Sequence, residues 1–238
     1  HTKIFGNVSE WPYDHFITGD KDKRGNFVQF APRLQSKGGA FDPDEWAQLF
    51  ADAGAKFAGP VAEHHDGFSM WASDVNPWNA KDMGPKLDLV GLLTDAIRKQ
   101  DMRVILSMHH AYNITGFYEA APQTDDPKLQ KLYGQQGKEA NEAMWLSKHK
   151  EIIDHYKPDI IWQDFNLHVI SQSVLLEFLS YYYNKAAEWN KNVVATYKDG
   201  LNPDCAVLDY ERGGPVDITE NYWLTDDAIS SSSWFYTE

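Results

Sequence analysis

The feature that most constrains the fold is a recurring unit, in which a segment with helical spacing of apolar residues is followed by a short apolar run. The helical segments cover residues 42–54, 88–100, 126–156 and 173–189, and the apolar runs cover residues 56–62, 102–108, 158–162 and 192–197. Strands that are apolar on both faces are typical of a parallel sheet covered by helices. We therefore expect an α/β fold built on a parallel sheet.

Two architectures place helices over such a sheet, the doubly wound sheet and the (β/α) barrel. A doubly wound dinucleotide-binding fold needs a glycine-rich turn after its first strand, and no G-x-G-x-x-G or Walker motif occurs in the chain. We therefore predict a TIM-like (β/α) barrel that forms one domain over residues 1–238. Because only four or five strands are evident, we expect the barrel to be irregular and incomplete.

Composition excludes several classes of protein. Apolar residues make up 42% of the chain and charged residues 24%, as in ordinary globular domains. The formal net charge of −13 would repel phosphate backbones, so we expect no nucleic acid partner. No run approaches the roughly 20 apolar residues that span a bilayer, so we expect no membrane partner. The single cysteine, Cys205, cannot form an internal disulfide.

Polar residues gather where three consecutive predicted strands end. The first strand leads into the block Glu-His-His-Asp-Gly-Phe at residues 63–68. The second ends at His109 and His110, and the third ends at Gln163 and Asp164. The carboxyl ends of parallel strands meet at one edge, where barrel enzymes place their active sites. The sequence therefore predicts an active site at this edge.

A metal site and a serine nucleophile are the first chemistries to consider. Adjacent residues of a strand point to opposite faces, so each His-His pair offers only one side chain to a shared ion. No H-E-x-x-H motif, cysteine–histidine cluster or G-x-S-x-G elbow occurs in the sequence. We expect no metal and no cofactor, and keep a metal-dependent barrel hydrolase as an alternative.

Carboxylates, aromatic rings and histidines remain, and glycoside hydrolases use this set of groups. We select Asp164 as the first carboxylate, because it ends a strongly apolar strand and Trp162 points to the same face. The second carboxylate belongs to the carboxyl-terminal segment, where the candidates are Asp209, Glu211, Asp217, Glu220, Asp226 and Asp227. We select Glu211, which follows an apolar run and precedes a glycine pair, and Glu220 is its rival.

Several motifs together resemble the retaining α-L-fucosidases of glycoside hydrolase family 29. They are FDPDEW at 41–46, GAKF at 54–57, EHHDGF at 63–68, NAKD at 79–82, GPKLD at 84–88, KPDIIWQD at 157–164 and SWFY at 233–236. The resemblance covers essentially the whole chain. It implies an irregular (β/α) barrel that removes terminal α-linked L-fucose with retention, through a covalent fucosyl-enzyme and without metal or cofactor.

The resemblance also implies roles for individual residues. Asp164 matches the nucleophile of the family's Trp-X-Asp motif, and we assign the acid/base role to Glu211. The residues assigned to substrate binding match fucose-contacting positions, end the second strand or lie near the acid/base: Glu10, Trp11, His64, His65, His109, Trp162, Lys198 and Trp234. The implied partner is a fucosylated oligosaccharide or glycoconjugate.

The chain departs from the family pattern at several points. The His-Trp-Gly motif of the family's first strand is not found, so we expect that strand before residue 1, and we expect the family's usual carboxyl-terminal β-sandwich to lie outside these 238 residues. Lys198 stands where many members have an arginine. Leu224 replaces the glutamate of a Trp-Glu pair, which favours Glu211 as the acid/base. We therefore expect a fragment, and a non-catalytic fucose-binding remnant is a second alternative.

Family membership also bears on location. The resemblance points to secretion, the periplasm or a lysosome. The sequence leaves open the fucosyl linkage, the aglycone and the oligomeric state.

Overall fold

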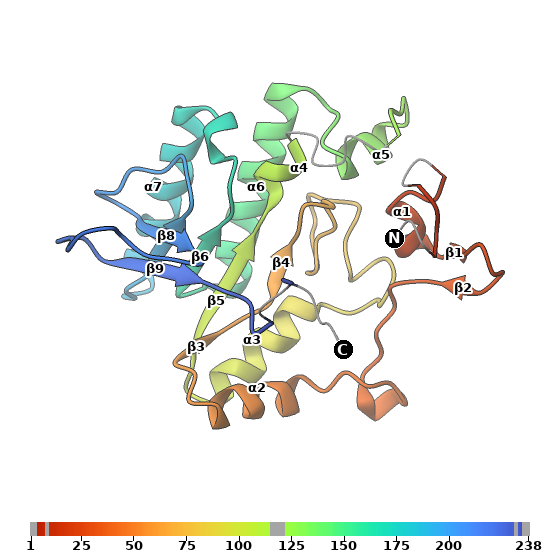
Figure 1. The fold of residues 1–238 in the computed structure, drawn as a ribbon, viewed down its shortest axis with the longest axis horizontal. Helices are drawn as coiled ribbons and strands as arrows, with labels where there is room; N and C mark the ends of the chain where they lie inside the picture. Colours follow the sequence, from red (N-terminus) through yellow and green to blue (C-terminus); the bar gives the residue numbers. More distant parts are fainter. Residues whose placement is uncertain (1–3, 8–9, 115–121, 231–232, 235–238) are drawn as a thin grey trace.

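The computed structural model describes residues 4–7, 10–114, 122–230 and 233–234, and its centre is a parallel sheet (Figure 1). The strand order is β3–β5–β6–β7–β8–β9, with β4 also paired to β5. The strands are β3 (Phe57–Ala58), β4 (Val61–Glu63), β5 (Arg103–Met108), β6 (Ile160–Gln163), β7 (Val194–Tyr197), β8 (Val207–Glu211) and β9 (Trp223–Asp226). Every pairing in this sheet is parallel, so the predicted α/β class with an incomplete barrel is confirmed.

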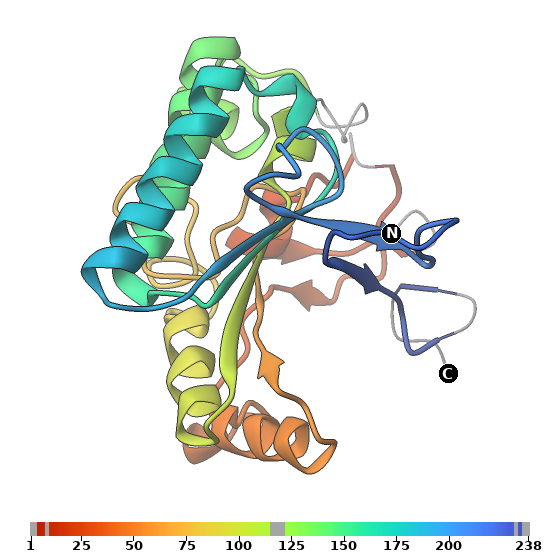
Figure 2. The same cartoon turned by 90° about the vertical axis from the view of Figure 1, so that its left-hand side faces the viewer.

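Helices cover one face of the sheet. Figure 2 shows α3, α6 and α7 on one side of the sheet, with the amino-terminal segment on the other. The helices are α1 (Asp14–Thr18), α2 (Pro43–Asp52), α3 (Leu89–Lys99), α4 (His110–Ile114), α5 (Pro127–Leu132), α6 (Lys138–Tyr156) and α7 (Gln172–Glu188). A small antiparallel pair, β1 (Asp20–Lys21) and β2 (Phe27–Val28), follows α1. None of the described helices is long and apolar enough to cross a membrane.

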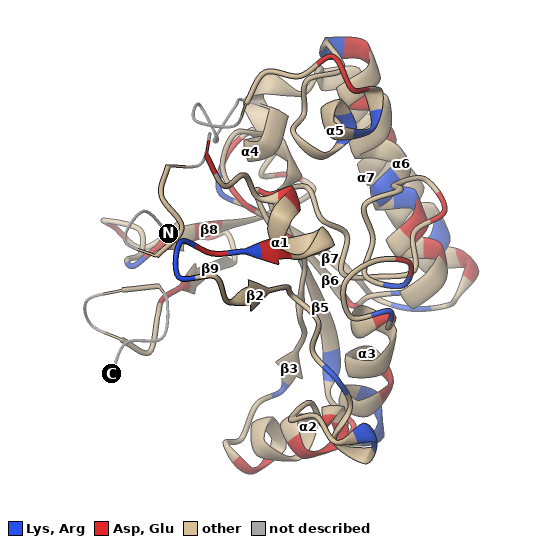
Figure 3. Ribbon diagram, turned by 90° about the vertical axis from the view of Figure 1, so that its right-hand side faces the viewer, with Lys and Arg blue, Asp and Glu red and all other residues tan. Residues whose placement is uncertain are grey.

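The core lies between the sheet and the helices. Leu106, Ile161 and Ala195 of three adjacent strands are fully buried, and Trp145 of α6 and Phe178 of α7 are buried as well. Charged residues gather on the helices, whereas the strands between them are mostly uncharged (Figure 3). The apolar runs at 102–108, 158–162 and 192–197 therefore contain buried strands, as predicted, whereas Phe57 and Val61 of the run at 56–62 are exposed.

Aspartates begin the two helices that precede β3 and β5. Asp42 Oδ1 accepts hydrogen bonds from two backbone N–H groups in the first turn of α2, at 3.0 and 3.1 Å. Asp88 Oδ1 accepts from the backbone N–H of Gly91 at 2.8 Å, and Tyr156 donates its hydroxyl to the other Asp88 oxygen at 2.9 Å. The helices predicted over residues 42–54 and 88–100 are confirmed, and each begins at an aspartate N-cap.

Two predicted elements are interrupted by glycine. The strand predicted over residues 56–62 is instead β3 and β4, because Gly59 approaches β5 so closely that a Cβ atom would lie 1.6 Å from Ile105 O. The helix predicted over residues 126–156 is also wrong, since it is divided into α5 and α6. Gly134 and Gly137 lie between them with φ of 64° and 90°, which glycine adopts without steric cost.

The register of the sheet aligns the strand ends. Met108 is paired with Glu63 of β4 and with Gln163 of β6, and Gln163 is paired with Tyr197 of β7. The next residues along these strands are His64, His109, Asp164 and Lys198. Four polar side chains therefore leave the sheet at the same level, on its carboxyl edge.

The cap of α2 gives a prediction about stability. Asp42→Ala removes the acceptor of two backbone N–H groups and should lower the free energy of unfolding by about 1 kcal/mol. Asp42→Asn retains a side-chain acceptor and should cost much less. Urea unfolding followed by circular dichroism measures both variants, and equal losses would show that the cap does not contribute.

Candidate active site

Three polar side chains meet at the carboxyl edge of the sheet. Asp164 Oδ2 lies 3.0 Å from His65 Nε2 and 2.8 Å from His109 Nδ1. Because His65 follows β4, His109 follows β5 and Asp164 follows β6, one carboxylate oxygen connects three strand ends. All three residues are buried. The structure thus brings together the polar residues that the sequence placed at three separate strand ends.

These contacts keep Asp164 ionised. Burial alone would raise the pKa of Asp164, but hydrogen bonds from His109 and His65 hold it well below its usual range. An ionised carboxylate only accepts hydrogen bonds, so both imidazoles donate to it. A carboxylate fixed in this way is positioned to act as a nucleophile without reorganisation.

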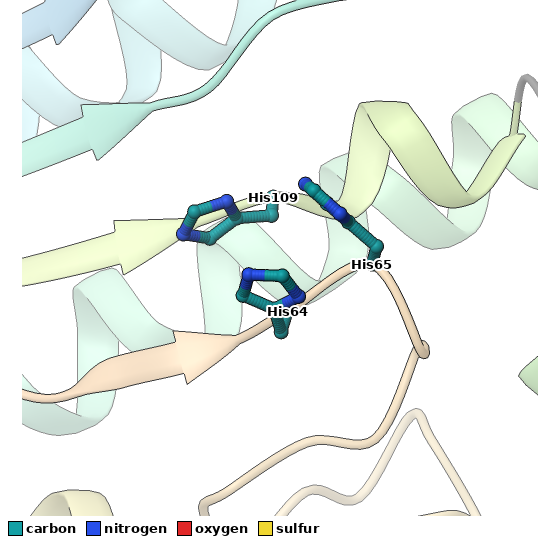
Figure 4. A group of neighbouring side chains, drawn as sticks. All are labelled: His64, His65 and His109. Atoms are coloured by element: carbon teal, nitrogen blue, oxygen red, sulfur yellow. The ribbon is translucent and has the colours of Figure 1, made fainter. Parts of the chain in front are cut away.

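His64 completes a group of three imidazoles (Figure 4). Its ring centroid lies 4.1 Å from that of His65 and 4.4 Å from that of His109. Burial and the two neighbouring imidazoles lower the pKa of His64 to about 3, so the ring is neutral at neutral pH. A neutral imidazole offers one donor and one acceptor, which suits the recognition of hydroxyl groups.

Lys198 supplies the positive charge of the site. Its Nζ lies 3.5 Å from Asp164 Oδ1, 2.9 Å from Glu211 Oε2 and 3.1 Å from Asp226 Oδ2. The lysine side chain is only 4% exposed. Burial would lower the pKa of Lys198, but Glu211 and the nearby aspartates raise it, so the ammonium persists. One cation therefore bridges carboxylates from β8, β9 and the end of β6.

Aromatic rings surround the same ammonium. Lys198 Nζ lies 5.0 Å from the ring centroid of Trp162, 4.9 Å from that of Phe165 and 5.8 Å from that of Trp234. Residues 235–236, which complete the motif at the end of the chain, lie outside the described residues. The predicted aromatic residues Trp162 and Trp234 therefore lie beside the carboxylates, where aromatic faces can pack on a sugar.

Glu211 is the better placed of the two candidate acids. Glu211 Oε2 lies 2.9 Å from Lys198 Nζ, and Asp164 Oδ1 lies 3.5 Å from the same nitrogen. The distance between these two carboxylate oxygens therefore cannot exceed the sum of the two contacts. This sum lies below the roughly 6.5 Å at which inverting pairs begin. Glu220 is exposed and lines a separate hollow with Tyr183 and Cys205.

Comparison with known proteins identifies the family of the chain and its fold. The family described as Alpha-L-fucosidase matches residues 1–238. The chain belongs to the α-L-fucosidase family. Tissue alpha-L-fucosidases of Rattus norvegicus and Homo sapiens are 31% and 29% identical to it, each over 232 residues. Each alignment covers 94% of this chain and 47% of the relative, so the chain spans about half the length of these fucosidases.

Solved fucosidase structures share the same architecture. Thermotoga maritima alpha-fucosidase, in complex with a mechanism-based inhibitor, has a TM-score of 0.57 and 27% identity to this chain. That comparison covers 78% of this chain and 42% of the other. An alpha-L-fucosynthase of the same organism gives a TM-score of 0.58 at 26% identity, covering 78% of this chain and 39% of the other. The resemblance to family 29 is therefore confirmed.

The fucosidase pattern also assigned Glu10 and Trp11 to sugar binding. Both lie in the amino-terminal segment, where Trp11 is buried and its Nε1 donates to Lys21 O at 3.2 Å. The Trp11 ring stacks on that of Phe5 with centroids 4.4 Å apart, and Glu10 Oε2 lies 3.5 Å from Lys23 Nζ. These contacts place the pair in an aromatic cluster beside β1. Their contact with a sugar stays a prediction.

Two aspartates at this edge of the sheet were not singled out from the sequence. Asp226 lies directly opposite Glu211 in the pairing of β8 with β9, and both contact Lys198. Asp209 is buried and accepts a hydrogen bond from Trp162 Nε1. Burial raises the pKa of Asp209, and the nearby negative charge of Asp226 raises it further. The hydrogen bond from Trp162 acts in the opposite direction and lowers this pKa. Only the strand register reveals these roles, since sequence spacing left both residues among several equal candidates.

Two groups of side chains have the spacing of metal ligands within the described residues. They are His64, His65 and His109 at the strand ends, and Asp74, Glu151 and His155 elsewhere, with the ligand atoms of each group within 4.8 Å of one another. In the first group, His65 and His109 already donate to Asp164. In the second, the Glu151 carboxylate accepts from Trp71 Nε1 and Ser73 Oγ at 2.7 and 2.6 Å. Both groups thus have hydrogen-bonding roles, and the expected absence of metal stays a prediction.

The pKa of His64 gives a prediction for titration. Since this pKa is about 3, the ring should stay neutral between about pH 8 and pH 5, whereas an exposed histidine titrates near 6.5. The unfolded chain binds this proton below about pH 6.5, so His64 should reduce stability as pH falls from there toward 3. Imidazole NMR signals report the titration, and a midpoint between pH 6 and 7 would refute the buried, neutral ring.

Proposed function

We propose that this site hydrolyses terminal α-L-fucosides with retention, using Asp164 as the nucleophile and Glu211 as the acid/base. The observation that carries the proposal is the ionised, buried Asp164, held by two imidazoles and sharing Lys198 with Glu211. Retaining glycosidases use two carboxyl groups about 5 to 5.5 Å apart, and the shared Lys198 is consistent with that spacing. The family supports the substrate class.

The reaction proceeds in two displacements. Asp164 attacks the anomeric carbon while Glu211 protonates the departing glycosidic oxygen, which leaves a fucosyl ester on Asp164. Glu211, now a carboxylate, then removes a proton from the water that attacks the same carbon. Asp164 departs as a carboxylate, and the two inversions give net retention.

Lys198 couples these steps electrostatically. In the free site, its ammonium is shared between Asp164, Glu211 and Asp226. When Asp164 becomes a neutral ester, the ammonium interacts only with the remaining carboxylates. It then favours ionised Glu211, which is the form that acts as the base in the second step.

The sugar contacts follow from the chemistry of the surrounding groups. The imidazoles supply donors and acceptors for hydroxyl groups, and the indoles supply flat apolar faces. We assign substrate binding to Glu10, Trp11, His64, His65, His109, Trp162, Lys198 and Trp234. The substrate is a fucosylated oligosaccharide or glycoconjugate, handled by residues 1–238 as a catalytic barrel domain. The named relatives include tissue and plasma fucosidases, which favours a secreted, periplasmic or lysosomal site of action.

Two other functions are distinguished from the proposed one by a single assay. Three imidazoles with ligand spacing favour a metal-dependent hydrolase, which would lose activity when a chelator is added. The other alternative is a non-catalytic fucose-binding remnant, which would bind fucose without turnover. Release of nitrophenolate from 4-nitrophenyl α-L-fucoside, with and without EDTA, separates both from the proposed fucosidase.

Asp164→Ala tests the nucleophile. The substitution removes the attacking oxygen, so the rate of nitrophenolate release should fall by more than about 10⁴-fold while the circular dichroism spectrum is retained. Added azide should restore turnover and give β-L-fucosyl azide, since a single displacement inverts the anomeric carbon. A folded variant that keeps the wild-type rate would rule out the assigned role.

Glu211→Ala and Glu220→Ala form a matched pair that tests the acid/base. Loss of Glu211 should reduce turnover by about 10²- to 10⁴-fold, and azide should restore it with the α configuration retained. Glu220 is exposed and away from Lys198, so its replacement should leave turnover unchanged. The reverse pattern of activity would transfer the role to Glu220.

A further inference from the structure

A buried ionic network lies directly beneath the active site. Glu63 ends β4, His110 begins α4 and Lys148 lies in α6, and all three side chains are almost fully buried. Lys148 Nζ lies 2.9 and 2.7 Å from the two carboxylate oxygens of Glu63. His110 Nδ1 contacts Glu63 Oε1, and Ser69 Oγ donates to Oε2 at 2.9 Å. The Glu63 carboxylate therefore has a partner on each oxygen.

The chain connects this network to the imidazoles of the site. Glu63 directly precedes His64 and His65, and His110 directly follows His109. The backbone N–H of His109 also donates to Glu63 O at 3.0 Å, which joins the two strand ends at this level. A displacement of Glu63 would therefore move the residues that carry both hydrogen-bond donors to Asp164.

Stability alone does not account for such a network. Burial would raise the pKa of Glu63, but the charge of Lys148 and the His110 contact lower it to about 2, so the carboxylate is ionised. Removing charges from water is costly, and buried ion pairs are often replaced by apolar residues without loss of stability. Buried ion pairs can instead specify one arrangement of the residues around them. The position that this pair gives to the adjoining strand ends is therefore the better explanation for it.

We propose that Glu63, Lys148 and His110 are positioning residues that hold the imidazoles of His65 and His109 against Asp164. The proposal deepens the fucosidase function and rests on it for its kinetic consequence. Lys148 anchors Glu63 to α6, so the outer helix layer determines the placement of the strand ends. The imidazoles in turn hold the nucleophile.

Lys148→Met and Glu63→Gln test this role, with Lys150→Met as the matched control. Lys150 lies in the same helix and pairs with Glu177 at 2.6 Å on the protein surface. The double variant Glu63→Gln with Lys148→Met removes both charges, so it tests the role even where a single variant does not fold. The readouts are the imidazole N–H NMR signals that Asp164→Ala abolishes, and kcat and KM for 4-nitrophenyl α-L-fucoside.

Both the imidazole NMR signals and the kinetic constants should change in every folded variant of Glu63 or Lys148. The imidazole signals should shift or disappear, and kcat should fall about 100-fold with little change in KM, as for a displacement of roughly 1 Å at a catalytic group. The Lys150 control should resemble the wild type. A folded network variant with wild-type imidazole signals would overturn the proposal. If the wild type releases no nitrophenolate, the proposed function fails, while the NMR signals still decide the positioning role.

Discussion

The site depends on one oxygen atom, Asp164 Oδ2, which accepts hydrogen bonds from imidazoles on two other strand ends. This contact requires β4, β5 and β6 to lie side by side in a register that brings Met108 opposite both Glu63 and Gln163. A slip of one residue would turn the side chains to the opposite face of the sheet and separate the carboxylate from its donors. The apolar strands are thus the means by which three distant segments meet at one anion.

Charged side chains lie in two layers around that contact. At the edge of the sheet, Lys198 contacts the carboxylates of Asp164, Glu211 and Asp226, while the imidazoles of His65 and His109 donate hydrogen bonds to Asp164. Below the edge, Lys148 offsets Glu63 in the interior. Because the Lys148–Glu63 pair is fully buried, its charges interact more strongly than they would in water. The overall charge of −13 therefore says little about the electrostatics of the site.

Much of this arrangement could be predicted from the sequence, because apolar runs and aspartate N-caps are local signals. The helices that begin at Asp42 and Asp88 were indicated by the spacing of their apolar residues, and Asp164 meets His65 and His109 because parallel strands end at one edge. The divided strand at Gly59 and the role of Asp226 were not predictable. Both depend on which backbone or strand lies alongside, and this is determined by tertiary packing. The buried contacts of Glu63 with Lys148 and His110 could not be predicted for the same reason, because the residues next to Glu63 in sequence, His64 and His65, face the site.

The most direct test of the proposed reaction is to trap the fucosyl ester on Asp164. A 2-deoxy-2-fluoro-α-L-fucosyl fluoride should react with the site, because its good leaving group permits the first displacement while the fluorine slows the second. Mass spectrometry of the intact protein and of its peptides then locates the bound sugar. We expect one fluorofucosyl group, carried by the peptide that contains Asp164. A sugar attached to Glu211 or another residue, or release of fluoride with inversion and no covalent adduct, would contradict it.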